Sequence, residues 1–173
     1  MSESIRKTYV IEWKGPFSQE DIDAINDKPR SGCLYLISGL VKYEHGGPKL
    51  QYIGLSTRGA AIRFKDRGHK ENLVIHEKQY WLGHFSNQRQ EATPANLELA
   101  EFALIYTCQP PLNDKKKMNR PGAPVAVINR WMTCNDRYRE KRIHPVQKTV
   151  PDVIVYDGET IWTCERLKYE AEL

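Results

Sequence analysis

Two short runs of bulky apolar residues constrain the fold of this chain more than any other feature. They are CLYLISG (33–39) and KLQYIGL (49–55). Runs of this length and composition are typical of buried β-strands. The segment between them contains Gly46-Gly47-Pro48, which is typical of a turn. We therefore expect the two strands to pair in an antiparallel hairpin.

A helix is expected directly after the hairpin. Ser56 or Thr57 can cap it, and it would run to about Lys70. Within this helix Arg63, Arg67 and Lys70 are spaced at i, i+4 and i+7, which places them on one face.

A third strand and a second helix complete the predicted core. The strand is QYWLGHF (79–85). Thr93-Pro94 combines a capping hydroxyl with a proline at the first helical position, which predicts a helix that ends before Pro110-Pro111. The expected fold class is α+β, with a small, mostly antiparallel three-stranded sheet flanked by helices over residues 31–113.

Extensions are expected on both sides of this core. Residues 1–30 would pack on it, with a strand over 8–13 and a short helix over Gln19–Asn26 capped by Ser18. Residues 114–173 would form a basic, exposed linker followed by a helix or strand at VAVINRWM. A hairpin near 153–162 would then turn at Asp157-Gly158.

Length and composition bound the class of protein. The chain has 173 residues and a formal net charge of +4, which fits one domain with a modest extension. No run approaches the roughly 18 apolar residues of a membrane span, and the first residues lack the apolar stretch of a signal peptide, so we expect a cytoplasmic protein. The four cysteines lie far apart without a C-x-x-C pair, so a zinc site is not expected.

A series of residues in fixed order carries the functional signal. Tyr35 lies in the first strand of the hairpin and YIG (52–54) in the second, and Arg63 follows Tyr52 by eleven residues. Glu101 begins an E-x-x-L-I pattern, which is followed by P-x-x-N ending at Asn113. This order and spacing resemble the GIY-YIG nuclease superfamily over about half of the chain.

The resemblance implies a metal-dependent endonuclease that hydrolyses phosphodiester bonds of DNA, with Mg²⁺ or Mn²⁺ as cofactor. It implies catalytic roles for five residues, of which Glu101 would be the metal ligand: Tyr35, Tyr52, Arg63, Glu101 and Asn113. Basic residues after the second strand would contact nucleic acid: Arg58, Arg67, His69 and Lys70.

The chain departs from the family pattern at several positions. The first element reads CLY, so two of its three letters differ, although Gly32 precedes it. Leu55 stands where some members carry a lysine. Arg67 stands where many carry a histidine or tyrosine, with His69 the nearest histidine.

The residues around Glu101 also make it a candidate site residue, independently of the resemblance. On a helix its neighbours at i−4, i+3 and i+4 are Leu97, Leu104 and Ile105. A charged carboxylate within an apolar arc costs several kcal/mol unless it has a partner. That partner can be a hard cation or an arginine such as Arg63, and Glu98 is the rival carboxylate one turn earlier.

Arg63 and the two tyrosines have plain chemical uses. A guanidinium can donate two hydrogen bonds to a phosphoryl oxygen pair that gains charge during cleavage. A tyrosine hydroxyl can act as the base for the attacking water if its pKa, near 10 when free, is lowered. The alternatives are a solvated helix face for Arg63 and core packing for Tyr35 and Tyr52.

Two other functions stay open. The altered first element allows a nucleic-acid-binding module of the same fold that has weak or no catalysis, and RNA is an alternative substrate. The sequence has one set of site residues, so one protomer can cut one strand at a time. Cutting both strands then requires either two protomers across a two-fold axis or release and rebinding, and of these we expect a homodimer when a palindromic duplex is bound.

Overall fold

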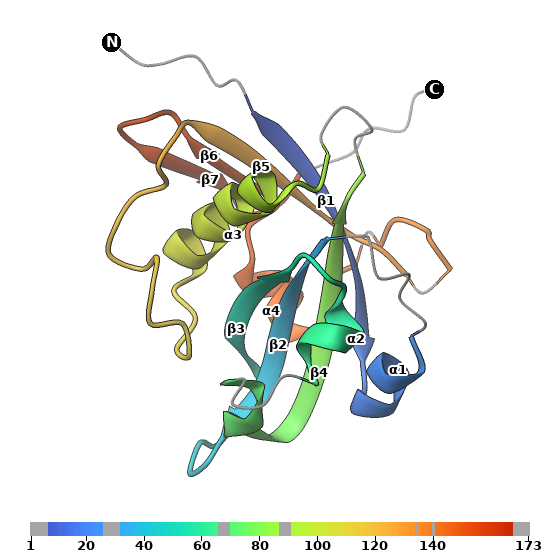
Figure 1. Ribbon diagram of the computed structural model, residues 1–173. Helices are drawn as coiled ribbons and strands as arrows, with labels where there is room; N and C mark the ends of the chain where they lie inside the picture. Colours follow the sequence, from blue (N-terminus) through green and yellow to red (C-terminus); the bar gives the residue numbers. More distant parts are fainter. Residues whose placement is uncertain are drawn as a thin grey trace.

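The computed structural model describes residues 7–25, 32–65, 70–86, 91–133, 135–139 and 141–167. Its centre is one seven-stranded sheet in the order β3-β2-β4-β1-β5-β6-β7, curled like half a barrel (Figure 1). The strands are β1 (Thr8–Phe17), β2 (Cys33–Val41), β3 (Lys49–Ser56), β4 (Val74–Phe85), β5 (Val125–Trp131), β6 (Val153–Tyr156) and β7 (Ile161–Cys164).

The helices are few, and most are short. They are α1 (Gln19–Ala24), α2 (Ala60–Arg63), α3 (Pro94–Cys108) and α4 (Pro145–Thr149), with a 3₁₀ turn at Lys70–Leu73. In the described part of the chain, no helix is long and apolar enough to cross a membrane.

The expectation of a small three-stranded sheet is wrong. Strands β3, β2 and β4 do pair antiparallel in that order. However, the other edge of β4 is occupied by β1, which pairs antiparallel with β4 and parallel with β5. Strands β5, β6 and β7 then continue the sheet antiparallel. The α+β class holds, but the sheet is mixed and draws strands from both expected extensions.

The local turn and cap predictions are confirmed. The two predicted hairpins form as β2–β3 and β6–β7. The Ser18 hydroxyl accepts from the Asp21 N–H to cap α1, and the Thr93 hydroxyl accepts from the Asn96 N–H to cap α3. Both caps satisfy a backbone N–H that the helix itself leaves unpaired.

The expected helix from Ser56 or Thr57 to Lys70 begins later than predicted, at Ala60, and residues 66–69 of the predicted range lie outside the described residues. Ser56 still belongs to β3, and its hydroxyl donates to the carbonyl oxygen of Gly59 and accepts from the Arg58 N–H. It is therefore not available as a helix cap. The helix α2 begins only after Gly59, whose φ of 94° requires glycine, and it spans four residues.

The sheet separates two apolar layers. Leu34 and Leu36 of β2 point to the layer that contains α3 and α4. Tyr35 and Ile37 point to the opposite layer, which contains residues of α1 and α2. This alternation follows from the two-residue period of a strand. It places Tyr35 beside α2, while α3 covers the other face (Figure 1).

Candidate active site

The outer edge of β3 is closed by the segment that follows α3. The Leu112 N–H donates to the carbonyl oxygen of Gln51 at 3.0 Å. The Asn113 side chain then pairs with Ile53 as a strand would: its Oδ1 accepts from the Ile53 N–H at 2.9 Å, and its Nδ2 donates to the Ile53 carbonyl at 2.8 Å. Asn113 is buried, so it holds the YIG strand in place.

Glu101 reaches the same edge from α3. Its carboxylate accepts a hydrogen bond from the Leu55 N–H. The side chain is buried, with 8% of the residue exposed, and burial raises the pKa of its carboxyl. The Lys116 ammonium lies 2.5 Å from Glu101 Oε2 and offsets part of that rise. The charge partner of Glu101 is therefore a lysine and not Arg63.

Glu98, the rival carboxylate, has a different environment. Its side chain is 65% exposed, and its Oε1 lies 3.3 Å from the same Lys116 ammonium. An exposed carboxylate is already solvated and gains little from an added cation. Glu101 is thus the better candidate for a ligand to a hard cation.

The glycine of YIG makes room for a tyrosine. Tyr35 on β2 lies opposite Gly54 on β3. A Cβ at Gly54 would lie 2.4 Å from both Cζ and Oη of Tyr35, so a side chain there would displace the ring. The Tyr35 ring instead crosses the strand and stacks with Tyr52, with ring centroids 6.1 Å apart.

A chain of hydrogen bonds connects three of the candidate residues. The Arg63 guanidinium donates to the Tyr35 hydroxyl, and the Tyr35 hydroxyl donates to the Tyr52 oxygen. Burial raises the pKa of both tyrosines above the ordinary value of 10. The positive charge of Arg63 opposes that rise at both, whereas the negative charge of Glu101 adds to it.

These groups meet at a cavity of about 270 Å³, here called the edge cavity. Its wall includes Tyr52 and Glu101 together with three lysines. Lys70 is fixed there because its ammonium donates to the Leu112 carbonyl at 2.9 Å and pairs with Asp114. The lining residues are Tyr52, Lys70, Glu101, Ile105, Asn113, Asp114, Lys115 and Lys116.

The structure brings all five predicted catalytic residues to one place. Three line the edge cavity, and Tyr35 and Arg63 are linked to it through Tyr52. Lys70 also lines it, and Arg58 is exposed in the loop between β3 and α2. Arg67 and His69 lie outside the described residues.

Lys115 and Lys116 are not among the site residues predicted from the sequence. Residues 114–122 were expected to form an exposed linker, yet Lys116 is half-buried against Glu101, and its ammonium lies 5.7 Å from the centre of the Phe102 ring. The three consecutive lysines directly after Asn113 were the available signal. Their distance in sequence from Glu101 gave no reason to pair them with it.

Comparison with known proteins adds no assignment. No protein-family model, no curated protein and no solved structure matches this chain.

Proposed function

We propose that this protein is a metal-dependent endonuclease of the GIY-YIG type, acting on DNA in the cytoplasm. One observation carries the proposal: Tyr35, Tyr52, Arg63, Glu101 and Asn113 gather at the outer edge of β3, although 78 positions separate the first from the last. A buried carboxylate, a guanidinium and two linked hydroxyls form a set that suits phosphodiester hydrolysis.

The side chains at the edge cavity fit a Mg²⁺ or Mn²⁺ ion. Magnesium binds proteins through one or two carboxylates and takes its other ligands from water and substrate phosphate. Glu101 would hold it. No group of three or more His, Cys, Asp or Glu side chains that could hold a metal lies within the described residues, so a many-ligand site is not the basis of the proposal. The bound ion would stabilise negative charge on the phosphoryl oxygens.

The protein's own residues would share the remaining work. Arg63 would orient Tyr35 in the resting state and donate to a phosphoryl oxygen of the substrate. Tyr52, in its deprotonated form, would accept the proton of the attacking water and become neutral. The Tyr35 hydroxyl, which donates to the Tyr52 oxygen, would stabilise the negative charge of that deprotonated form before the transfer. Asn113 would act as a positioning residue, because both of its side-chain hydrogen bonds go to the backbone of Ile53 on β3.

A binding module without catalysis is the second candidate. The contact between Lys116 and Glu101 favours it, since a permanent lysine partner would exclude a metal ion from the carboxylate. RNA is the alternative substrate for the nuclease.

The experiment compares the wild type with Glu101→Gln on labelled DNA and RNA, with and without Mg²⁺. We expect the wild type to cleave DNA only with the metal, and E101Q to lose cleavage by at least about 1000-fold while retaining nucleic-acid binding. Glu98→Gln is the matched control, with expected activity close to wild type. Binding without cleavage by the wild type would favour the binding module, and equal activity of E101Q would contradict the role of Glu101.

A further inference from the structure

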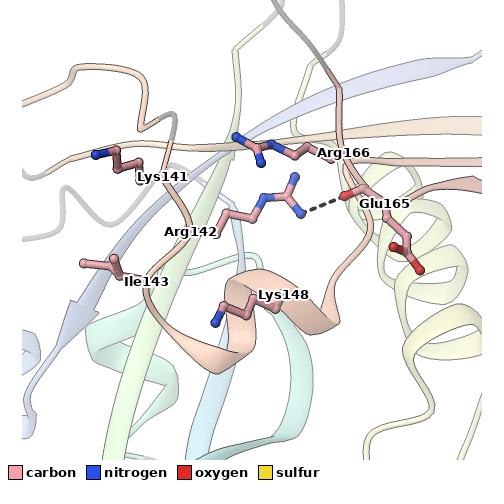
Figure 2. Close-up of a pocket in the computed structure, with 6 residues that line it drawn as sticks. All are labelled: Lys141, Arg142, Ile143, Lys148, Glu165 and Arg166. Atoms are coloured by element: carbon pink, nitrogen blue, oxygen red, sulfur yellow. Dashed lines mark hydrogen bonds between the residues drawn. The ribbon is translucent and has the colours of Figure 1, made fainter.

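A second cavity, of about 500 Å³, lies beside α4 and is lined mainly by basic side chains. It is here called the basic cavity. Three segments form it: the chain before α4, α4 itself and the chain after β7 (Figure 2). The lining residues are Lys141, Arg142, Ile143, Lys148, Glu165 and Arg166.

Arg142 is the structural centre of this cavity. Its guanidinium donates to the Glu165 carbonyl at 2.7 Å and forms an ion pair with Asp152. The Asp152 side chain is 2% exposed and also accepts from the Leu167 N–H at 2.6 Å. These bonds fix the backbone on both sides of Arg166, so that residue is held at the cavity rim.

The remaining charges do not balance. The described lining residues include four cationic side chains, Lys141, Arg142, Lys148 and Arg166, and one acidic side chain, Glu165. Asp152, behind the lining, interacts with both arginines and offsets part of their charge. Figure 2 shows the Glu165 carboxylate turned away from Arg166, while its backbone carbonyl faces Arg142. The cavity therefore presents a net positive potential to solvent.

The basic cavity is connected to the strand that carries the candidate active site. Helix α4 packs against β3. Val146 and Val150 are fully buried in the same apolar layer as Ile53. Helix α4, which carries the exposed Lys148, is thus packed on the strand that also carries Tyr52, although Tyr52 packs against the opposite layer.

We propose that the basic cavity binds the phosphate backbone of nucleic acid at a point separate from the edge cavity. The proposal rests on the proposed nuclease function for its choice of nucleic acid as the polyanion. A backbone with regularly repeated phosphates can contact several of the cations in this cavity along its length, and each phosphate contact adds to the electrostatic part of the affinity. Contacts of this kind set the register of the substrate without reading its sequence.

Ile143 adds an apolar surface to the cavity, which suits contact with the sugars of a sugar-phosphate chain. It is 71% exposed beside the cationic groups. An apolar side chain next to cations matches a ligand in which phosphates alternate with less polar sugars. The volume of about 500 Å³ exceeds what one phosphate needs and lies in the range of sites for small organic ligands.

The test measures binding of a labelled duplex of about 20 base pairs in EDTA, so that cleavage does not interfere. Lys148→Ala with Arg166→Ala removes two cations of the basic cavity. Lys42→Ala with Arg120→Ala removes the same two residue types elsewhere on the surface. We expect the first pair to weaken binding about 10-fold at low salt and to reduce the slope of log K against log salt by about 2. The second pair should change affinity by about 2-fold or less.

A single charge reversal, Lys148→Glu, provides an independent variant on an exposed helix position. It should weaken binding at least as much as Lys148→Ala, with an unchanged thermal unfolding midpoint. Single-turnover cleavage at saturating protein should be unchanged in all of these variants, because none lines the edge cavity.

The outcomes separate this proposal from the proposed function. Cleavage by the wild type with equal affinity in K148A/R166A and K42A/R120A would overturn the basic cavity and leave the nuclease standing. Reduced affinity in K148A/R166A without cleavage by the wild type would support the basic cavity and overturn the nuclease. Binding to vesicles rich in phosphatidylserine, with none to DNA or RNA, would assign the cavity to lipid headgroups and overturn the proposal.

Discussion

The edge cavity and the basic cavity are both lined by lysines, but the buried carboxylate lies in a different place in each. In the edge cavity, Glu101 lines the wall, and its partner Lys116 approaches from a loop. In the basic cavity, the buried acid is Asp152, which is fixed behind Arg142 and is not among the lining residues. A carboxylate on the wall can exchange its lysine for a metal ion, whereas Asp152 serves to hold the cavity together.

The two cavities also differ in whether hydroxyl groups are connected to them. The edge cavity is connected through Tyr52 to Tyr35 and Arg63. No tyrosine, serine or threonine lines the basic cavity among its described residues. One cavity therefore has groups that can move protons and the other has only groups that attract anions. We infer that chemistry belongs to the first and binding to the second.

Of all the variants, Tyr52→Phe is expected to distinguish the roles of the two cavities most clearly. Removing the hydroxyl of the proposed general base should slow cleavage about 1000-fold near pH 8 and leave nucleic-acid affinity unchanged. The pKa of Tyr52 is raised, so its deprotonated fraction at neutral pH is small and grows about tenfold per pH unit. The wild-type rate should therefore rise with pH, and this rise should vanish in Y52F. Single-turnover rates between pH 6 and 9 provide the measurement.

Tyr35→Phe is the matched control for the base assignment. It removes the hydroxyl that donates to Tyr52, which raises the pKa of Tyr52 further and moves the pH–rate profile to higher pH. The cleavage rate of Y35F should still rise with pH with the same slope as that of the wild type. Unaltered rates in both variants would mean that the tyrosines only pack and that another group activates the water.

Arg63→Ala should produce the next largest effect, a loss of about 100-fold in the cleavage rate, the usual scale for one transition-state donor. K148A/R166A should show the opposite pattern, with reduced affinity and an unchanged rate. Pre-steady-state cleavage at saturating protein separates the two quantities. The division of labour between the cavities would be wrong if R63A lost only affinity.

Lys116→Met should have the smallest effect of these variants, and the quantity that changes is the stability of the protein. It leaves the buried Glu101 charge without its lysine, so the free energy of unfolding should fall by about 2 kcal/mol at pH 7. The pKa of Glu101 is already raised by burial and should rise further. The loss therefore applies above that pKa and disappears as pH falls and the carboxyl gains a proton.

Lys148→Met is the control, with an expected change within about 0.5 kcal/mol because Lys148 is exposed. Thermal unfolding with and without Mg²⁺ adds a second readout. Mg²⁺ should stabilise K116M more than the wild type, because the ion no longer competes with the lysine. Equal stabilisation would show that Lys116 does not occupy the metal position.

The contrast between Glu101 and Lys116 shows what sequence could predict about the site. Glu101 has a helical pattern of apolar neighbours, and the structure confirms that it is buried and needs a partner. Lys116 lies in an irregular loop with a φ of 66°, a conformation that no periodic pattern indicates. Its contact with Glu101 depends on how the loop returns to α3, so the charge partner was predicted as a metal or an arginine.

In the fold, too, the features set by neighbouring residues were predictable from the sequence, whereas the contacts between distant segments were not. The turns at Gly46-Gly47 and Asp157-Gly158 and the cap at Thr93 were predictable because neighbouring residues determine them. The alternation in β1 indicated a strand with one buried face. It contained no information on which strands flank it, and β4 and β5 lie far along the chain from β1.

The closed edge of β3 also limits how copies of this protein can associate. A terminal strand normally offers unpaired backbone groups to which another strand can add. On β3, Leu112, Asn113 and Glu101 already occupy those groups at Gln51, Ile53 and Leu55. Sheet extension between two molecules is therefore directed to β7, the other terminal strand of the described sheet, where Trp162 is 62% exposed. The residues proposed for catalysis thus also protect the chain against edge-to-edge aggregation on their side of the sheet.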